Sequence, residues 1–265
     1  MKFEDKVSRL RKEKFDGKET QAFLDDVKKM CEGEAFEYLL GEVSFCGAKV
    51  DLSLRPMIPR PETECWLGQV IALEKKRVES GEATEAREKS STFRALDLFA
   101  GSGCVGLAVL KNISAATVDF IEIDPKSKLQ IERSLDKNKI DHFRAKVMTG
   151  DCFEGATGVY DIIFAVPPYV PKGMQEEVMQ ELHAEEPLFF FDKEDGFYFH
   201  TEVLKRTKEF LKNEGVLYLE FDISQREKIE VLVKESGFTD YAFLQDPYGH
   251  ECVVAVKNVF IDKTN

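Results

Sequence analysis

A short glycine-rich segment has the residue types that bind a nucleotide-like cofactor. It reads DLFAGSGCVG, from Asp97 to Gly106, and follows an apolar run that is typical of a buried strand. Glycines at such a turn let the backbone approach a ligand closely, and the N–H groups of the following helix point toward that ligand. Glu122 ends the next predicted strand, 21 residues after Gly101. A carboxylate in that place can accept both hydroxyls of a ribose, so the segment predicts a ribose-bearing cofactor.

Two cofactor classes fit this signature, namely nicotinamide or flavin dinucleotides and S-adenosylmethionine. Asp97 favours the second class, because its carboxylate can bind the amino group of a methionine moiety, whereas a dinucleotide site excludes an acid near the pyrophosphate. In GDCF, Asp151 can accept a hydrogen bond from an adenine amino group while Phe153 packs nearby. We therefore predict S-adenosylmethionine as the cofactor. The predicted cofactor-binding residues are Asp97, Phe99, Gly101, Gly103, Glu122, Asp151, Cys152, Phe153 and Val166.

The segment Val166-Pro167-Pro168-Tyr169 follows the fourth predicted strand and has the properties of a substrate loop. Two prolines fix two φ angles and remove two N–H groups, which leaves a rigid edge of carbonyl acceptors that suits a substrate NH₂ group. Tyr169 adds a flat face against which a planar amide or base can lie. Since an amide nitrogen is a poor nucleophile, orienting it toward a sulfonium methyl group is most of the catalysis. We predict that these four residues are catalytic.

The elements that must position these motifs alternate between strand and helix from residue 93 onward. Five apolar runs predict strands, which are FRALDLF, ATVDFIEI, AKVMTGD, VYDIIFAV and EGVLYLEFD. FTDYAFLQ and ECVVAVKNVFI, joined by DPYGH, predict an antiparallel hairpin. A mostly parallel sheet covered on both faces follows from this order, with ligands bound beyond the carboxyl ends of its strands. Ser224 is the expected N-cap of the helix in SQREKIEVLVKES.

The first part of the chain has a different pattern of apolar residues. Residues 1–40 have apolar positions at helical spacing, and residues 41–61 predict a β-hairpin that turns at Gly47 and continues into a proline-rich stretch. A helix from about residue 62 to residue 79 is expected to pack Trp66 against the sheet, and a polar loop, ESGEATEAREKSST, follows it. We predict three parts: a helical N-terminal domain (1–40), a β-hairpin linker (41–61) and the main domain (62–265).

Composition excludes several classes of protein. The 265 residues carry a net charge of −12, which argues against stable binding to nucleic acid through its phosphate backbone. No apolar run is long enough for a membrane span, and no apolar stretch follows the first charged residues as in a secretory signal. The six cysteines include no CxxC pair, and the four histidines are scattered. We expect a cytoplasmic monomer with no metal site.

Motif by motif, the chain resembles the HemK/PrmC family of release factor glutamine methyltransferases. The most specific match is IPRPETE at residues 58–64, and EYLLG and SFCG precede it. The later matches follow in the family's order and are DLFAGSGCVGLAV, FIEID, GDCFE, the PPY loop, EEPLFFFDKEDGF, LYLEFDISQ and QDPYGHECVV. The resemblance covers residues 34–258 and includes every motif discussed above.

The resemblance implies a class I S-adenosylmethionine-dependent methyltransferase, with a Rossmann-like seven-stranded sheet, an antiparallel C-terminal hairpin and a small helical substrate-recognition domain in front. It further implies N5-methylation of the glutamine side chain in the GGQ motif of class I peptide chain release factors, which would be protein partners. It also places Arg60 and Glu62 at the pocket, and we predict that both bind substrate together with Val166, Pro167 and Tyr169.

Two departures from the family leave alternatives open. The family's catalytic loop reads Asn-Pro-Pro-Tyr, but Val166 occupies the asparagine position. Losing that hydrogen bond in the transition state costs about 2–4 kcal/mol, or about 10²–10³ in rate. The chain is then a slow enzyme, an enzyme with another substrate such as an exocyclic amine of nucleic acid, or a binding protein that retains the cofactor pocket. In addition, only about 40 residues precede the hairpin, fewer than in the family's usual helical domain.

Overall fold

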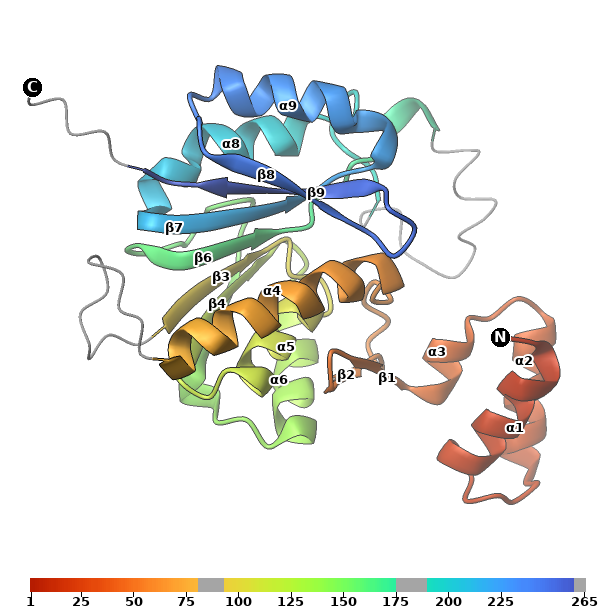
Figure 1. Ribbon diagram of the computed structural model, residues 1–265. Helices are drawn as coiled ribbons and strands as arrows, with labels where there is room; N and C mark the ends of the chain where they lie inside the picture. The colour runs from red at the N-terminus through yellow and green to blue at the C-terminus, as the bar shows by residue number, and fades with distance from the viewer. Residues whose placement is uncertain (81–92, 175–189, 260–265) are drawn as a thin grey trace, which may run out of the picture.

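The computed structural model describes residues 1–80, 93–174 and 190–259 (Figure 1). Most of the predicted polar loop after the long helix lies outside these residues, as does the first part of EEPLFFFDKEDGF. In the described part of the chain, no helix is both long enough and apolar enough to cross a membrane.

The main sheet has seven strands in the order β5-β4-β3-β6-β7-β9-β8. The strands are β3 (Phe93–Leu98), β4 (Ala116–Glu122), β5 (Ala145–Thr149), β6 (Tyr160–Ala165), β7 (Leu211–Glu220), β8 (Tyr241–Gln245) and β9 (Glu251–Lys257). Strands β3 to β7 run parallel, and β9 pairs antiparallel with both β7 and β8. The predicted mostly parallel sheet with an antiparallel C-terminal hairpin is confirmed.

Helices cover both faces of this sheet (Figure 1). They are α4 (Pro61–Ser80), α5 (Cys104–Asn112), α6 (Lys126–Asn138), α8 (Tyr198–Phe210) and α9 (Arg226–Glu235). Alternate residues of β6 enter the two hydrophobic layers: Ile162 and Phe164 pack on the side of α4 and α5, and Ile163 packs on the side of α8 and α9. All six residues of β6 are buried, because helices cover the central strand on both sides.

Helix α4 is held to the sheet by Trp66, as predicted. The indole is completely buried and lies nearly parallel to the ring of Tyr218, with 6.3 Å between centroids. Its Nε1–H donates to the carboxylate of Glu220 at 2.7 Å. A buried indole needs such a partner, so this hydrogen bond orients the first turns of α4 relative to the end of β7.

The N-terminal helices α1 (Phe3–Lys14), α2 (Gln21–Cys31) and α3 (Phe36–Leu40) form a small body beside the main sheet (Figure 1). They share a core of their own, which contains Leu10, Phe23, Met30, Phe36 and Leu39. The side chain of Lys14 contacts the carboxylate of Asp26 at 2.8 Å and the Leu39 carbonyl at 2.6 Å. The division of the chain into three parts, and the recognition role of the first, stay predictions.

The predicted hairpin is confirmed as β1 (Glu42–Phe45) and β2 (Ala48–Asp51). Cys46 and Gly47 both have positive φ, 45° and 78°, as a two-residue turn with the favoured twist requires. The outer edge of β2 is not left unpaired, because the backbone N–H of Asp51 donates to Ser134 Oγ on α6 at 2.9 Å. This contact ties the hairpin to the main domain.

The predicted N-cap of the last long helix is wrong. Asp222, not Ser224, caps it, and the helix begins with a 3₁₀ turn at Ile223–Gln225 that leads into α9. The Asp222 carboxylate accepts from the Ser224 N–H at 2.9 Å, and the Gln225 side chain accepts from the Asp222 N–H at 3.0 Å. An acid two residues earlier therefore competes successfully with the serine for the orphan N–H groups.

Two helical glycines provide a test of this packing. A Cβ at Gly106 in α5 would lie 2.3 Å from Phe120 Cε1, so we expect Gly106→Ala to lower the free energy of unfolding by about 1–3 kcal/mol. The control is Gly68→Ala in α4, where the nearest atom is Cys46 Sγ at 4.0 Å. That change should raise the free energy of unfolding by about 0.5–1 kcal/mol. Urea unfolding measures both, and equal effects would contradict the packing argument.

Candidate active site

The carboxyl ends of four parallel strands bring four side chains into one row. Leu98 of β3 pairs with Ile121 of β4 and with Ala165 of β6, and Ala165 pairs with Leu219 of β7. One residue further along each strand, the row contains Glu122, Phe99, Val166 and Glu220 in that order. Neighbouring strands lie about 4.8 Å apart, so residues far apart in sequence become neighbours here.

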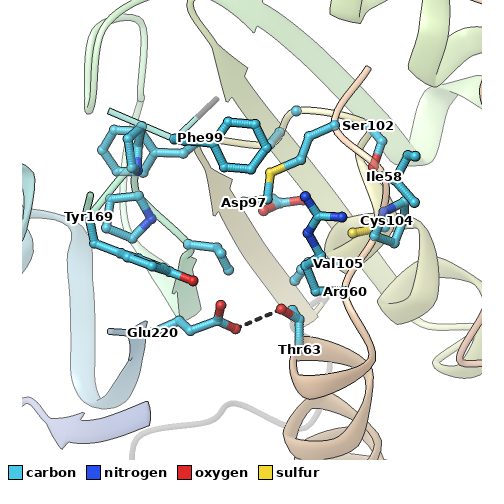
Figure 2. A pocket seen from close by; sticks show the side chains of 18 of the residues that line it. Ile58, Arg60, Thr63, Asp97, Phe99, Ser102, Cys104, Val105, Tyr169 and Glu220 are labelled. Carbon is cyan, nitrogen blue, oxygen red and sulfur yellow. Dashed lines mark hydrogen bonds between the residues drawn. The ribbon is translucent and has the colours of Figure 1, made fainter. Parts of the chain in front are cut away.

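Two cavities open along this row. The larger has a volume of about 450 Å³ and the smaller about 140 Å³. They share five lining residues, which are Met57, Phe99, Gly101, Val166 and Pro168. Glu122 lines only the smaller cavity and Glu220 only the larger, so the row runs from one cavity to the other. Figure 2 shows the larger cavity with Asp97 and Phe99 on one side and Tyr169 and Glu220 on another.

Glu122 organises the glycine-rich turn. One carboxylate oxygen accepts from the Gly101 N–H at 2.8 Å, and the other accepts from the N–H groups of Ile123 and Asp124. Burial raises the pKa of Glu122 although these three hydrogen bonds oppose the rise. A carboxylate has about four acceptor sites, so one remains for a ligand hydroxyl in the smaller cavity. This geometry fits one of the two predicted ribose hydroxyl contacts.

Asp97 is a buried acid with one described hydrogen bond, from the Gly106 N–H to its carboxylate at 2.9 Å. Burial, with a smaller contribution from the charge of Glu122, raises the pKa of Asp97 to about 8. Its side chain lines the larger cavity beside Gly101. A cationic ligand group placed there would restore the charged form of the acid, which fits the ammonium group of a methionine moiety.

The smaller cavity has walls suited to a planar ring. Ile121, Phe191 and Phe199 are among its apolar lining residues, and Asp151 is at its rim. The Asp151 carboxylate accepts from Lys193 Nζ at 2.8 Å, in a contact that is about half exposed to solvent. Together with Glu122 and Asp97, these residues fit a ligand with a base, a ribose and an amino-acid group.

The substrate loop is held from two sides. The Tyr169 carbonyl accepts from Gln225 Nε2 at 3.1 Å, while Val170 exchanges backbone hydrogen bonds of 2.9 Å with Phe190 and Asp192. Burial raises the pKa of Tyr169, and the nearby Glu220 carboxylate adds to the rise, so the phenol is neutral at ordinary pH. The loop therefore offers a fixed ring face in the larger cavity.

Most of the predicted site residues line one or both cavities. These are Arg60, Asp97, Phe99, Gly101, Glu122, Asp151, Cys152, Val166, Pro167, Pro168 and Tyr169. The structure places three others elsewhere. Gly103 packs at the start of α5, where a Cβ would lie 2.6 Å from Ile131 Cγ1; Phe153 stacks on Phe210 in the core; and Glu62 is exposed on the first turn of α4.

Sequence reasoning missed the acid at the end of β7. Glu220 is 6% exposed, and its Oε2 accepts from Thr63 Oγ1 at 2.8 Å and from Trp66 Nε1 at 2.7 Å (Figure 2). The signal was present in LYLEFD, because an acid that ends an apolar strand had already identified Glu122. Thr63 and Trp66 could not be linked to it, since about 155 residues separate them from Glu220 in the sequence.

Comparison with known proteins agrees with this geometry. Residues 83–209 match the family described as "Conserved hypothetical protein 95". The chain is 27% identical over 234 residues to a release factor glutamine methyltransferase of Thermodesulfovibrio yellowstonii, an alignment that covers 87% of this chain and 79% of that protein. It is also 27% identical over 258 residues to the protein of that name from Streptococcus pneumoniae, which covers 97% and 86% of the two chains.

Among solved structures, the fold is similar to that of a T. thermophilus 16S rRNA N2 G1207 methyltransferase in complex with AdoMet and guanosine. The TM-score is 0.51 at 20% identity, and the match covers 82% of this chain and 49% of that one. The chain has the class I methyltransferase fold. The predicted resemblance to the HemK/PrmC family is confirmed by these relatives. The T. thermophilus structure contains AdoMet, which is the cofactor that the sequence predicts for this chain.

The burial of Asp97 predicts a trade-off between stability and cofactor binding. Because the pKa of Asp97 is raised to about 8, the stability that its neutral form contributes is complete below about pH 4 and is lost as the pH rises through about 8. In the absence of cofactor, Asp97→Asn should therefore unfold at a higher temperature than the wild type at pH 8.5, with little difference at pH 4.

The same change should weaken S-adenosylmethionine binding about 10–100-fold, since a charge-assisted hydrogen bond is lost. Thermal unfolding at the two pH values and titration calorimetry at pH 8 measure the two effects. Unchanged affinity would show that Asp97 does not contact the cofactor.

Proposed function

We propose that this methyltransferase transfers a methyl group to the side-chain amide nitrogen of the GGQ glutamine in a class I peptide chain release factor. The observation that carries the proposal is the position of the Pro-Pro-Tyr loop. Pro167, Pro168 and Tyr169 line the larger cavity, and Pro168 also lines the smaller one, together with Glu122. The names of the related proteins support the same substrate.

Different residues of the two adjoining cavities would bind the cofactor and position the substrate. Glu122, Asp97 and Asp151 would hold S-adenosylmethionine, which supplies an electrophilic methyl group on a sulfonium. The two prolines present carbonyl acceptors to an NH₂ group, and Tyr169 supplies the flat surface for the amide plane. Val166 adds an apolar surface to this cavity, which would reduce the access of water to the reacting nitrogen.

We further propose that residues 1–40 recognise the release factor, residues 41–61 link the two parts, and residues 62–265 carry the reaction. The N-terminal helices support this division because they have a core separate from the main sheet. The hairpin of β1 and β2 is anchored to α6 through Asp51, so a partner bound by the N-terminal helices would be presented at a defined position.

The direct test is methyl transfer to a purified release factor. Incubation with labelled S-adenosylmethionine should place one methyl group on the GGQ glutamine, located by mass spectrometry of the digested protein. A release factor in which this glutamine is replaced by leucine is the matched control and should remain unmodified.

Two other outcomes separate the alternatives. Transfer to single-stranded RNA or DNA, with none to the release factor, would identify an exocyclic-amine methyltransferase. Cofactor binding without transfer to any of these acceptors would identify a binding protein whose catalysis is impaired at Val166. Either outcome would contradict the proposed function.

A further inference from the structure

Val166 removes a hydrogen-bond acceptor at the position where the two cavities meet. Its side chain lines both cavities and is only partly buried, so a substrate nitrogen in the larger cavity would face an apolar group there. The loop carbonyls can accept one N–H of an amide. The second N–H would be left without a partner, and a buried unsatisfied donor is costly. Another acceptor is needed for efficient transfer.

Glu220 is adjacent to Val166 in the row at the carboxyl edge of the sheet. Because Ala165 of β6 pairs with Leu219 of β7, the next residue on each strand is Val166 and Glu220. The side chain of Glu220 lines the larger cavity, as do Pro167 and Tyr169. An acceptor lost at the end of one strand therefore has a neighbouring acceptor at the end of the next.

The two oxygens of Glu220 have different surroundings. Thr63 Oγ1 and Trp66 Nε1 both donate to Oε2, which fixes the carboxylate plane against α4. Across the described ranges of the chain, no hydrogen bond is made to Oε1 and no ion pair is made to Glu220. Figure 2 shows the second oxygen directed toward the side of the cavity where Tyr169 lies. Oε2 thus holds the carboxylate in place through hydrogen bonds, and Oε1 is available to a ligand.

Arg60 is a cationic residue that lines the same cavity, and its charge acts on Tyr169. The other groups that face this carboxylate are acidic or neutral. They come from several elements and are Glu62 on α4, Cys104 on α5, Tyr169 on the loop, Cys252 on β9 and His200 on α8, whose Nε2 lies 3.0 Å from the Glu220 carbonyl. Burial raises the pKa of Glu220 and lowers the pKa of His200 to about 4, so the histidine is neutral. A substrate N–H is therefore a favourable partner for the available oxygen.

We propose that Glu220 is the acceptor that orients the transferring nitrogen, in the role that asparagine at position 166 has in the family pattern. This inference rests on the proposed function, and it names the residue that would allow transfer to the amide despite Val166. A carboxamide would donate one N–H to a carbonyl of the Pro-Pro-Tyr loop and the other to Glu220 Oε1. An ionised carboxylate cannot donate, so the arrangement selects the NH₂ end of the glutamine amide over its carbonyl end.

The same contact provides a path for the proton. As the nitrogen lone pair forms the bond to the methyl carbon, the carbon–sulfur bond breaks and its electron pair stays on sulfur. The nitrogen then carries a positive charge until one N–H proton leaves. Glu220 accepts this proton and releases it to water, which returns both the product amide and the carboxylate to their ordinary states.

The variant Glu220→Gln tests the proposal sharply. Because Thr63 and Trp66 both donate to Oε2, the amide oxygen of glutamine should take that position and its NH₂ group should face the cavity. A donor would then oppose the substrate's donor. We expect kcat for the release factor to fall about 10²–10³-fold, while the Kd for S-adenosylmethionine changes less than about 2-fold. Affinity for a GGQ peptide, measured with S-adenosylhomocysteine bound, should fall about 10-fold.

Rescue separates positioning from a structural role. Val166→Asn returns an acceptor to the neighbouring strand, so Val166→Asn combined with Glu220→Gln should recover activity to within about 10-fold of the wild type. The wild-type kcat should rise with pH as Glu220 ionises, and this rise should be absent in the double variant. Glu74→Gln is the control, since Glu74 is also a buried acid but pairs with Arg77 on α4, outside both cavities. Its activity should match that of the wild type.

The outcomes distinguish this inference from the proposed function. If the wild type methylates the release factor and Glu220→Gln does so equally well, the inference is overturned and the function stands. The inference also fails if the double variant is no better than Glu220→Gln alone. If the wild type itself transfers no methyl group, the proposed function fails and the inference fails with it.

Discussion

The parallel register of β6 with β3 and β7 is the constraint on which the rest of the structure depends. It places Phe99, Val166 and Glu220 at the same level of the sheet, and the pairing of β3 with β4 adds Glu122. Hydrogen bonds between neighbouring strands fix these levels to within one residue, and a slip by one residue would turn each side chain to the opposite face. The register thus brings the two cavities together, although the glycine-rich turn and the Pro-Pro-Tyr loop are far apart in the sequence.

Buried acids are the second feature of the site. Asp97, Glu122 and Glu220 are each at most 8% exposed, and burial raises the pKa of all three. Such groups oppose folding unless they are hydrogen-bonded, and backbone N–H groups, Thr63 and Trp66 supply part of that compensation. In our proposal, ligands supply the remainder: an ammonium group at Asp97, a hydroxyl at Glu122 and a substrate N–H at Glu220. The site is therefore tuned for ligand binding at some cost to the stability of the free protein.

The sequence predicted the class of fold and much of the site because these depend on local patterns. Apolar runs that alternate with amphipathic segments identified the parallel strands. The glycine-rich turn with Glu122 predicted a ribose-bearing cofactor, and Asp97 and GDCF favoured S-adenosylmethionine. It failed where a side chain's direction was decided by packing. Phe153 was expected beside an adenine but stacks on Phe210, and Ser224 was expected to cap a helix that Asp222 caps instead.

By itself, therefore, the sequence determined the class of fold and the loop that presents carbonyl acceptors, and it predicted the cofactor, since short-range spacing and residue chemistry are enough for these. Only the tertiary structure decided that Glu220 lies beside Val166, and that Thr63 and Trp66 occupy one of its oxygens and leave the other to a ligand. The reason is physical. The relative level of two strands and the docking of α4 are set by hydrogen bonds and packing between distant segments, so they cannot be deduced from residue spacing within one segment.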